Sequence, residues 1–155
     1  MNDREQILEG AGYPLARGPQ ENPTIDLISI LGNTVYASGQ VPVDGGELKS
    51  KGKVPSQVSV EEATAAAELC AANIMRAVAL KLGSLDRIQR VVRVTGYVNT
   101  DPDFTDCHLI INGATNLFKQ VFGEEHGRHA RTALGMGQLP LGTSVEVEAI
   151  LELKQ

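Results

Sequence analysis

The chain has 155 residues, of which 42% are hydrophobic, 21% are charged and 4% are aromatic. This length suits one domain over residues 1–155, and the composition is that of a globular protein rather than a disordered one. The formal net charge is −5, which argues against binding to nucleic acid because phosphate neutralisation supplies most of the affinity of such proteins. The nearest basic candidates, Lys49, Lys51 and Lys53, lie in a glycine-containing loop and are expected to be solvated.

The first 25 residues are predicted to be a peripheral N-terminal extension. Asp3–Leu8 can form a short helix, and Pro14–Pro23 is expected to be extended coil. The charged segment Met1–Gly10 lacks the apolar stretch of a signal peptide, and no apolar run approaches the ~20 residues of a membrane span. We therefore expect a soluble cytoplasmic protein with no membrane contact. Cys70 and Cys107 have neither metal-type spacing nor the context of a disulfide scaffold.

A β-hairpin is predicted where two short apolar runs, Leu27–Leu31 and Thr34–Ala37, flank Gly32-Asn33. A Gly-Asn pair readily adopts the positive φ of a two-residue turn. The second strand continues into Ser38–Pro42, where a proline that cannot donate to a ladder ends the pairing. Asp44–Lys53 is expected to be a loop.

The next element is predicted to be a long helix with clear signals at both ends. Ser59 can cap it, with Glu62 reaching back in a capping box, and Gly83 ends it after Leu82. Its apolar positions recur at helical spacing and form one buried face. They are Ala63, Ala66, Ala67, Cys70, Ile74, Ala77 and Val78.

Arg87–Asn99 is the clearest strand of the sequence, and strict alternation gives it two different faces. The apolar face is expected to carry Ile88, Val92, Val94, Gly96 and Val98. The opposite face is mixed rather than purely polar, and a sheet face of that kind often meets another subunit or a ligand. It carries Gln89, Val91, Arg93, Thr95, Tyr97 and Asn99.

A second helix and two strands complete the predicted order. The helix is expected to start at Asp101-Pro102-Asp103 and to end at Gly123, with Gly113 in its middle marking a close approach because glycine costs about 1 kcal/mol there. The strands are His129–Gly137 and Ser144–Leu153. The order β-β-α-β-α-β-β indicates an α+β domain with a single sheet and two helices on one of its faces.

The usual catalytic signatures are absent from the sequence. It contains no nucleophile elbow, phosphate loop, dinucleotide-binding glycine pattern or zinc-binding helix motif. The three histidines, His108, His126 and His129, are not spaced as metal ligands on one element. They are expected to have solvated or capping roles rather than to bind a metal ion.

Arg131 is unusual because it lies in a strand made otherwise of small and apolar residues. A guanidinium offers a planar fork of donors that matches a carboxylate, so Arg131 is a candidate carboxylate clamp. The alternative is an arginine that snorkels from a strand edge or forms a structural ion pair with Glu146 or Glu148. Glu148 is expected to project from a strand that pairs with the strand of Arg131.

Several motifs together resemble the Rid (YjgF-like) family of small deaminases. Val35–Pro42, with the sequence VYASGQVP, is similar to the family's SGQxP segment. Ala130–Ala133, followed by Leu139-Pro140 and Val145–Ile150, resembles its C-terminal signature, and Val94–Phe104 is similar to its middle. The likeness covers residues 25–153 and is greatest to the longer subgroup, whose second helix is rich in Asn, Gly and Ala, here Asn112-Gly113-Ala114.

This resemblance implies a chorismate-mutase-like fold assembled as a homotrimer, with sites in the clefts between subunits. The implied reaction is the hydrolysis of reactive enamines or imines, such as 2-aminoacrylate, to a 2-keto acid and ammonia without a cofactor. Carried over by position, Arg131 binds the substrate carboxylate and Glu148 orients the attacking water. Ser38 and Gly39 line the pocket, and Asn112 lies near it.

The sequence departs from the family pattern at Ala133, where many of these deaminases carry a cysteine. The backbone of Ala133 can replace that of the cysteine, but not its thiol. Two other functions stay open: a non-catalytic trimer that binds small carboxylates or metabolites, and an endoribonuclease or translation inhibitor. The acidic net charge argues against the second.

Overall fold

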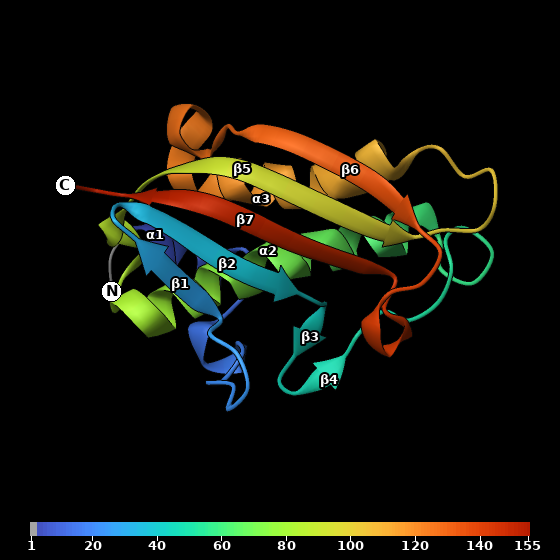
Figure 1. Cartoon of the computed structure of the whole chain (residues 1–155), viewed down its shortest axis with the longest axis horizontal. Helices are drawn as coiled ribbons and strands as arrows, with labels where there is room; N and C mark the ends of the chain where they lie inside the picture. Colours follow the sequence, from blue (N-terminus) through green and yellow to red (C-terminus); the bar gives the residue numbers. More distant parts are fainter. Residues whose placement is uncertain (1–2) are drawn as a thin grey trace.

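The computed structural model describes residues 3–155, and its main body is a five-stranded sheet with two long helices on one face (Figure 1). The strand order is β1-β2-β7-β5-β6; β5 and β6 are parallel, and the other neighbouring pairs are antiparallel. The strands are β1 (Ile28–Leu31), β2 (Thr34–Gln40), β5 (Ile88–Asn99), β6 (Ala130–Met136) and β7 (Val145–Leu153), and the long helices are α2 (Val60–Leu82) and α3 (Cys107–Gly127). The predicted α+β class and element order are confirmed.

Smaller elements complete the chain. They are the helix α1 (Asp3–Gly10), the short hairpin of β3 (Val43–Asp44) and β4 (Glu47–Leu48), and single turns of 3-10 helix at Leu15–Arg17, Leu85–Arg87 and Pro140–Gly142. The hairpin lies in the segment that was expected to be a loop. It forms its own two-stranded sheet beside the main one.

Helix α2 begins and ends where its local signals place it. The Ser59 hydroxyl accepts a hydrogen bond from the backbone N–H of Glu62 at 3.0 Å, and Gly83 ends the helix in the left-handed conformation with φ 84°. The helix is long and apolar enough to cross a membrane by length and composition. Most of it is buried against the sheet and α3, however, and a core helix passes the same test.

Small residues let the two long helices approach closely. A Cβ placed on Gly113 of α3 would lie 2.2 Å from the backbone oxygen of Thr64 in α2, so the predicted close packing is confirmed. Helix α3 starts at Cys107 rather than at the expected Asp101, because the Asp101 carboxylate accepts hydrogen bonds from the N–H and hydroxyl of Ser56. The helix also continues beyond Gly123, where the backbone is locally non-helical.

Two irregularities in the pairing of β5 with β7 overturn part of the predicted alternation. The register shifts between Ile88 and Arg90 and again between Val91 and Arg93. Each bulge moves the following side chains to the other face. Val91 is therefore fully buried and Val92 is half-buried, the reverse of what strict alternation predicts.

The N-terminal segment is packed onto the body as far as residue 18, so the expectation of a peripheral extension is wrong for this part. Leu8 is fully buried in the main hydrophobic core, and Arg4 Nη1 donates to the backbone oxygens of Leu85 and Ile88. These contacts are long-range, which local sequence patterns do not reveal. Within this N-terminal segment, residues 20–26 are the stretch in which every residue is exposed.

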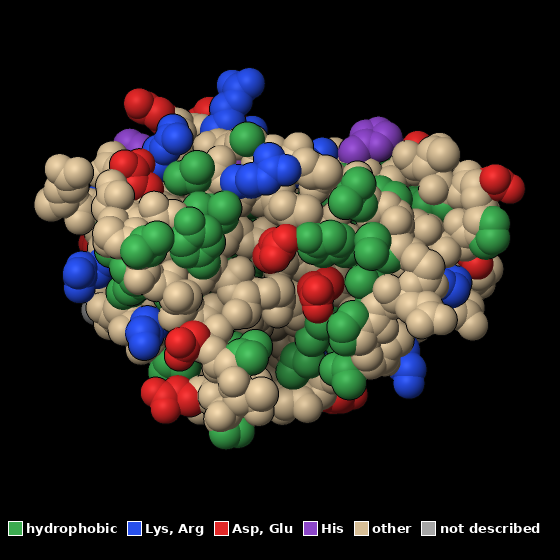
Figure 2. Space-filling view, viewed as in Figure 1, with side chains coloured by type: hydrophobic (Ala, Val, Ile, Leu, Met, Phe, Trp, Pro, Cys, Tyr) green, Lys and Arg blue, Asp and Glu red, His purple; other side chains and the backbone are tan. Residues whose placement is uncertain are grey.

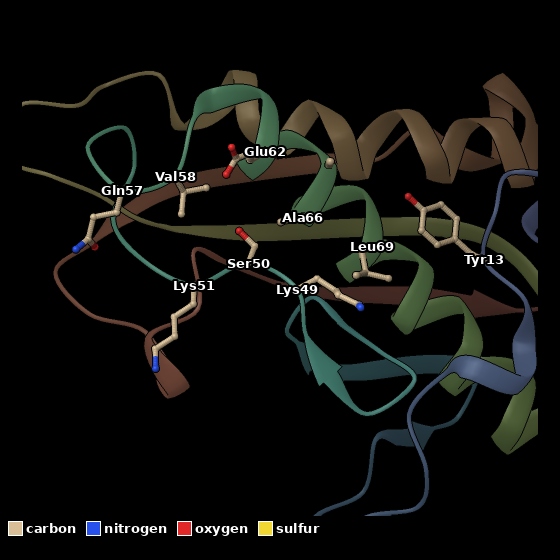
Figure 3. Close-up of a pocket in the computed structure, with 10 residues that line it drawn as sticks. Tyr13, Lys49, Ser50, Lys51, Gln57, Val58, Glu62, Ala66 and Leu69 are labelled. Atoms are coloured by element: carbon tan, nitrogen blue, oxygen red, sulfur yellow. The ribbon is translucent and has the colours of Figure 1, made fainter.

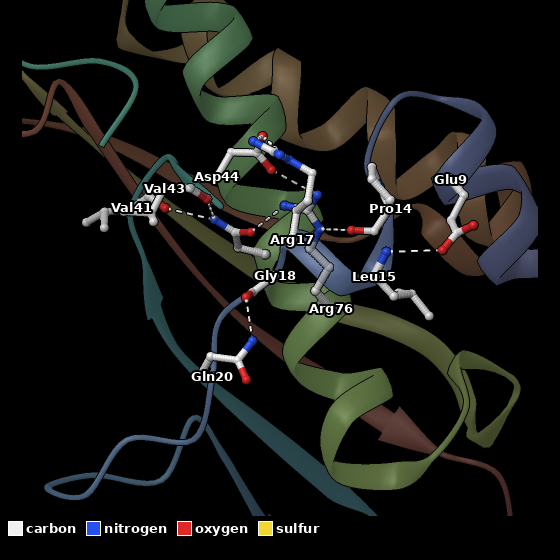
Figure 4. A network of polar contacts seen from close by, with 11 residues as sticks. Glu9, Pro14, Leu15, Arg17, Gly18, Gln20, Val41, Val43, Asp44 and Arg76 are labelled. Carbon is white, nitrogen blue, oxygen red and sulfur yellow. Dashed lines mark hydrogen bonds and ion pairs between the residues drawn. The ribbon is translucent and has the colours of Figure 1, made fainter. Parts of the chain in front are cut away.

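The buried Arg76 of α2 holds the N-terminal segment against the helix through hydrogen bonds (Figure 4). Arg76 is 2% exposed, and its guanidinium donates to the Pro14 backbone oxygen at 3.0 Å, to Asn73 Oδ1 at 3.0 Å and to Asp44 Oδ1 at 3.1 Å. Asp44 also pairs with Arg17 at 2.7 Å, which lowers the pKa of its carboxyl. Through the hydrogen-bonded guanidinium of Arg76, the network joins helix α2, the N-terminal segment and strand β3.

Candidate functional site

Arg131 lies in the edge strand β6 and turns toward helix α3. Its Nη1 donates to Asn112 Oδ1 at 2.8 Å and to Thr115 Oγ1 at 3.1 Å, and its Nη2 donates to the backbone oxygen of His108 at 3.2 Å. One helix therefore orients the whole guanidinium. The structure brings together Arg131 and Asn112, two of the residues that the resemblance assigns to the site.

All three acceptors around Arg131 are neutral oxygens. Within residues 3–155 no ion pair includes Arg131, so the structural ion pair with Glu146 or Glu148 is not formed within this chain. Partial burial lowers the pKa of Arg131, but an arginine remains protonated at neutral pH. The side chain is held in place while its charge is left uncompensated.

Ala133 follows two residues along β6 and lies on the same side of the sheet as Arg131. It is half-buried and packs against the core opposite Gly96 of β5. Because β6 is an edge strand, one row of its backbone groups has no neighbouring strand among residues 3–155.

The other predicted residues lie on the opposite, open face of the sheet. Glu148 of β7 stands beside Thr95 of β5, and the Tyr97 hydroxyl donates to Glu148 Oε1 at 2.5 Å. A hollow of about 290 Å³ opens here and contains both Ser38 and Glu148. Its lining residues are Ser29, Tyr36, Ala37, Ser38, Arg93, Thr95, Glu148, Ala149 and Ile150.

Figure 2 shows the character of this open face. Hydrophobic side chains are scattered over the sheet, and acidic side chains stand among them near its centre. Tyr36 and Leu134 are each 44% exposed on strands β2 and β6. The open face thus exposes hydrophobic side chains, unlike an ordinary polar surface, and carries charged ones, unlike a buried core.

Ser38 and Gly39 form an irregular stretch of β2, where the pairing with β7 is interrupted between Ala37 and Gln40. The Ser38 hydroxyl donates to the backbone oxygen of Asp26 at 2.7 Å. A Cβ added to Gly39 would lie 3.0 Å from the carboxylate of Glu146, so the glycine allows close contact with that side chain.

Glu146 is the functional candidate that sequence reasoning did not place in the site. Its carboxylate is partly buried beside Gly39, and burial, together with the nearby charge of Glu148, raises its pKa. Alternation along β7 does put both glutamates on one face. The alternation does not show which of the two glutamates contacts Gly39, because this contact depends on the interrupted register of β2.

The predicted residues form two groups that one chain does not unite. Strand β5 separates β6 from β7, so the expectation that the strands of Arg131 and Glu148 pair is wrong. The first group, Arg131, Asn112 and Ala133, lies on the helix-covered side at the edge of the sheet. The second group, Ser38, Gly39, Glu146 and Glu148, lies toward the open face.

A further cavity of about 520 Å³ lies between α2 and the segment around residues 49–58 (Figure 3). It contains none of the predicted site residues. Lys49 at its rim pairs with Glu47 at 3.0 Å, and Lys53 donates to Asn99 Oδ1 at 2.7 Å. Across residues 3–155, no group of three or more His, Cys, Asp or Glu side chains is arranged to hold a metal ion.

The sheet order and the two long helices on one face define a protein of chorismate-mutase-like fold. The family model described as "YjgF/chorismate_mutase-like, putative endoribonuclease" matches residues 7–153. The chain belongs to this family, as the resemblance predicted.

Three relatives illustrate the similarity. Protein TCP17 of Trypanosoma cruzi is 40% identical over 144 residues, which cover 93% of this chain and 89% of that protein. The crystal structure of the protein Atu1372, of unknown function, from Agrobacterium tumefaciens is 43% identical with a TM-score of 0.89, covering 97% of this chain and 92% of that one. A putative endoribonuclease from Shewanella oneidensis is 29% identical with a TM-score of 0.90, covering 98% and 100%.

Proposed function

We propose that this protein hydrolyses small enamines or imines that carry a carboxylate, such as 2-aminoacrylate, to 2-keto acids and ammonia. The observation that carries the proposal is the arrangement at Arg131. Three neutral oxygens of α3 fix its guanidinium, and no carboxylate of residues 3–155 neutralises it. A planar cation held in this way suits a carboxylate ligand that arrives from outside the chain.

The chemistry needs little more than orientation and a base. An enamine first tautomerises to the imine, whose protonated form is already electrophilic at C2. Water then adds to C2 while a carboxylate takes its proton, the C–N bond breaks, and ammonia leaves to give the keto acid. Arg131 fixes the position of C2 by holding the adjacent carboxylate, and positioning of this kind supplies much of the rate.

Glu148 was expected to be the group that orients the water, and Glu146 is a second candidate for that role. The raised pKa of Glu146 brings it nearer to the pH at which a general base works best, and Gly39 leaves room beside it. Glu148 is held instead by the Tyr97 hydroxyl. In the proposed site, one of the two carboxylates receives the proton from water. The negative charge of the other carboxylate raises the pKa of the first.

A site of this kind requires two copies of the chain. Arg131 and the glutamates lie on opposite sides of one sheet, but edge strand β6 of one subunit can approach the open face of another. The exposed side chains of Tyr36 and Leu134 would be covered by such an approach. We therefore propose a closed homotrimer with composite sites between subunits.

The direct experiment compares Arg131→Ala and Arg131→Lys with the unchanged protein. The imine is generated in situ, and release of keto acid is followed. Loss of a bidentate charged contact costs about 2–5 kcal/mol, which predicts a fall of about 30- to several-thousand-fold in kcat/KM. Lysine should restore little of it, because an ammonium cannot form two parallel bonds.

Melting temperature and oligomeric state, measured on the same variants, serve as the control and should change little. Full activity of Arg131→Ala would place the chemistry elsewhere. Retained binding of 2-keto acids by the unchanged protein, without any imine hydrolysis, would favour the non-catalytic carboxylate-binding trimer.

A further inference from the structure

The hollow on the open face holds a cation that the proposed reaction does not use. Arg93 of β5 lines this hollow together with Ser38 and Glu148. Its Nη2 donates to Thr132 Oγ1 at 2.6 Å, and among the ion pairs of residues 3–155 none includes Arg93. One nitrogen of the guanidinium is therefore anchored, while its charge has no carboxylate partner.

A second arginine on the same strand provides a contrast. Arg90 Nε lies 3.3 Å from Glu152 Oε2, so its charge is paired within the chain. Arg90 and Arg93 both belong to β5, three residues apart, and both are exposed. Only Arg93 lines the hollow.

The position of Arg93 relative to Glu148 follows from the strand register. Arg93 stands opposite Ile150 and Thr95 stands opposite Glu148, so the guanidinium and the carboxylate come from diagonal positions of neighbouring strands. The hollow between them is about 290 Å³, close to the lower end of the volumes that hold small ligands. It therefore suits a compact molecule rather than an extended one.

We propose that Arg93 binds a second carboxylate of the substrate, so that the preferred substrates are the imines of short dicarboxylic amino acids such as aspartate and glutamate. This inference rests on the proposed function. With the first carboxylate held by Arg131 of a neighbouring copy and C2 held near the glutamates, the substrate side chain extends into the hollow. The guanidinium fork of Arg93 then meets the second carboxylate and offsets its repulsion from Glu148.

The test compares imines made in situ from aspartate and from alanine by a flavin-dependent amino-acid oxidase. The unchanged protein should show a kcat/KM about ten- to a hundredfold higher for the dicarboxylic imine, which is the usual range for a hydrogen-bonded charged contact. Arg93→Gln should abolish this preference, because it lowers kcat/KM for the dicarboxylic imine about ten- to a hundredfold more than for the alanine imine. Arg90→Gln removes the same charge from the same strand and should leave the preference intact.

A readout without turnover separates the two proposals. Oxaloacetate and pyruvate are titrated into each protein, and the ratio of their dissociation constants is measured. An equal preference in all proteins, or equal effects of the two variants, would overturn the role of Arg93. Oxaloacetate binding that depends on Arg93, in a protein that hydrolyses neither imine, would support the second-carboxylate site and reject the proposed reaction.

Discussion

The two halves of the candidate site are built in different ways. The Arg131 half is organised by one helix, since Asn112, Thr115 and His108 all belong to α3. The open-face half draws its groups from strands β2, β5 and β7, and its arginine, Arg93, lacks an ion-pair partner within residues 3–155. The Arg131 half is therefore preorganised by a single helix, whereas the open-face half combines side chains from three strands. The predictions below test this difference.

The largest effect is expected from the two glutamates. If Glu146 is the base, Glu146→Gln should lower kcat by about 10²–10⁴-fold, the usual contribution of general-base catalysis. Glu148→Gln should leave more activity and move the acidic limb of the pH profile of kcat/KM to lower pH. Removal of the Glu148 charge lowers the raised pKa of Glu146, so the base becomes ionised at lower pH.

The measurement is a pH–rate profile of each variant on the same imine. A base must be deprotonated, so activity should rise as pH increases through the pKa of Glu146. If Glu148→Gln shows the larger loss and Glu146→Gln retains the profile, the two roles are reversed and Glu148 is the base.

Gly39→Val should have a smaller but clear effect on activity. The new side chain would press on the Glu146 carboxylate, since even a Cβ would lie 3.0 Å from it. Overpacking of this kind costs about 1–3 kcal/mol, which predicts a loss of about 5- to 150-fold in kcat/KM if the strain falls on the Glu146 carboxylate. Gly137→Val is the matched control, because a Cβ there meets nothing within 4 Å. Equal activities of the two variants would mean that Gly39 serves only the bend of β2.

Tyr97→Phe should produce the smallest change. The hydroxyl of Tyr97 donates to Glu148, an interaction that also raises the pKa of Tyr97 to about 12. Loss of one hydrogen bond is worth about 0.5–1.5 kcal/mol, or about two- to tenfold in kcat/KM. Tyr36→Phe removes a hydroxyl from the same hollow that has no hydrogen bond among the described residues, and it should have no effect. A loss as large as that of the glutamate variants would show that Tyr97 takes part in proton transfer.

Features with local causes could be predicted from the sequence. The Ser59 cap, the Gly83 terminus and the close packing at Gly113 each follow from residue types at one position and its neighbours. The α+β class follows from the order of the predicted helices and strands. The family signature also placed Arg131 and Asn112 together, although no periodicity could show that their side chains touch.

Features that depend on register could not be predicted in this way. The bulges that bury Val91 have no marker in the alternation of β5. The separation of Arg131 from Glu148 arises because β7, the last strand, enters between β2 and β5. The same insertion places Glu146 against Gly39. In each case a distant strand decides which face a side chain occupies.

The central claim is that each site combines Arg131 of one subunit with the glutamates of another. Subunit mixing tests it most directly: Arg131→Ala is co-refolded at equal amounts with the double variant Glu146→Gln, Glu148→Gln, each of which is inactive alone. One of the three sites of every mixed cyclic trimer should combine an intact arginine with intact glutamates. Random assembly therefore restores about a quarter of all sites, and about a quarter of the original activity should return. Mixed trimers without activity would contradict the composite site.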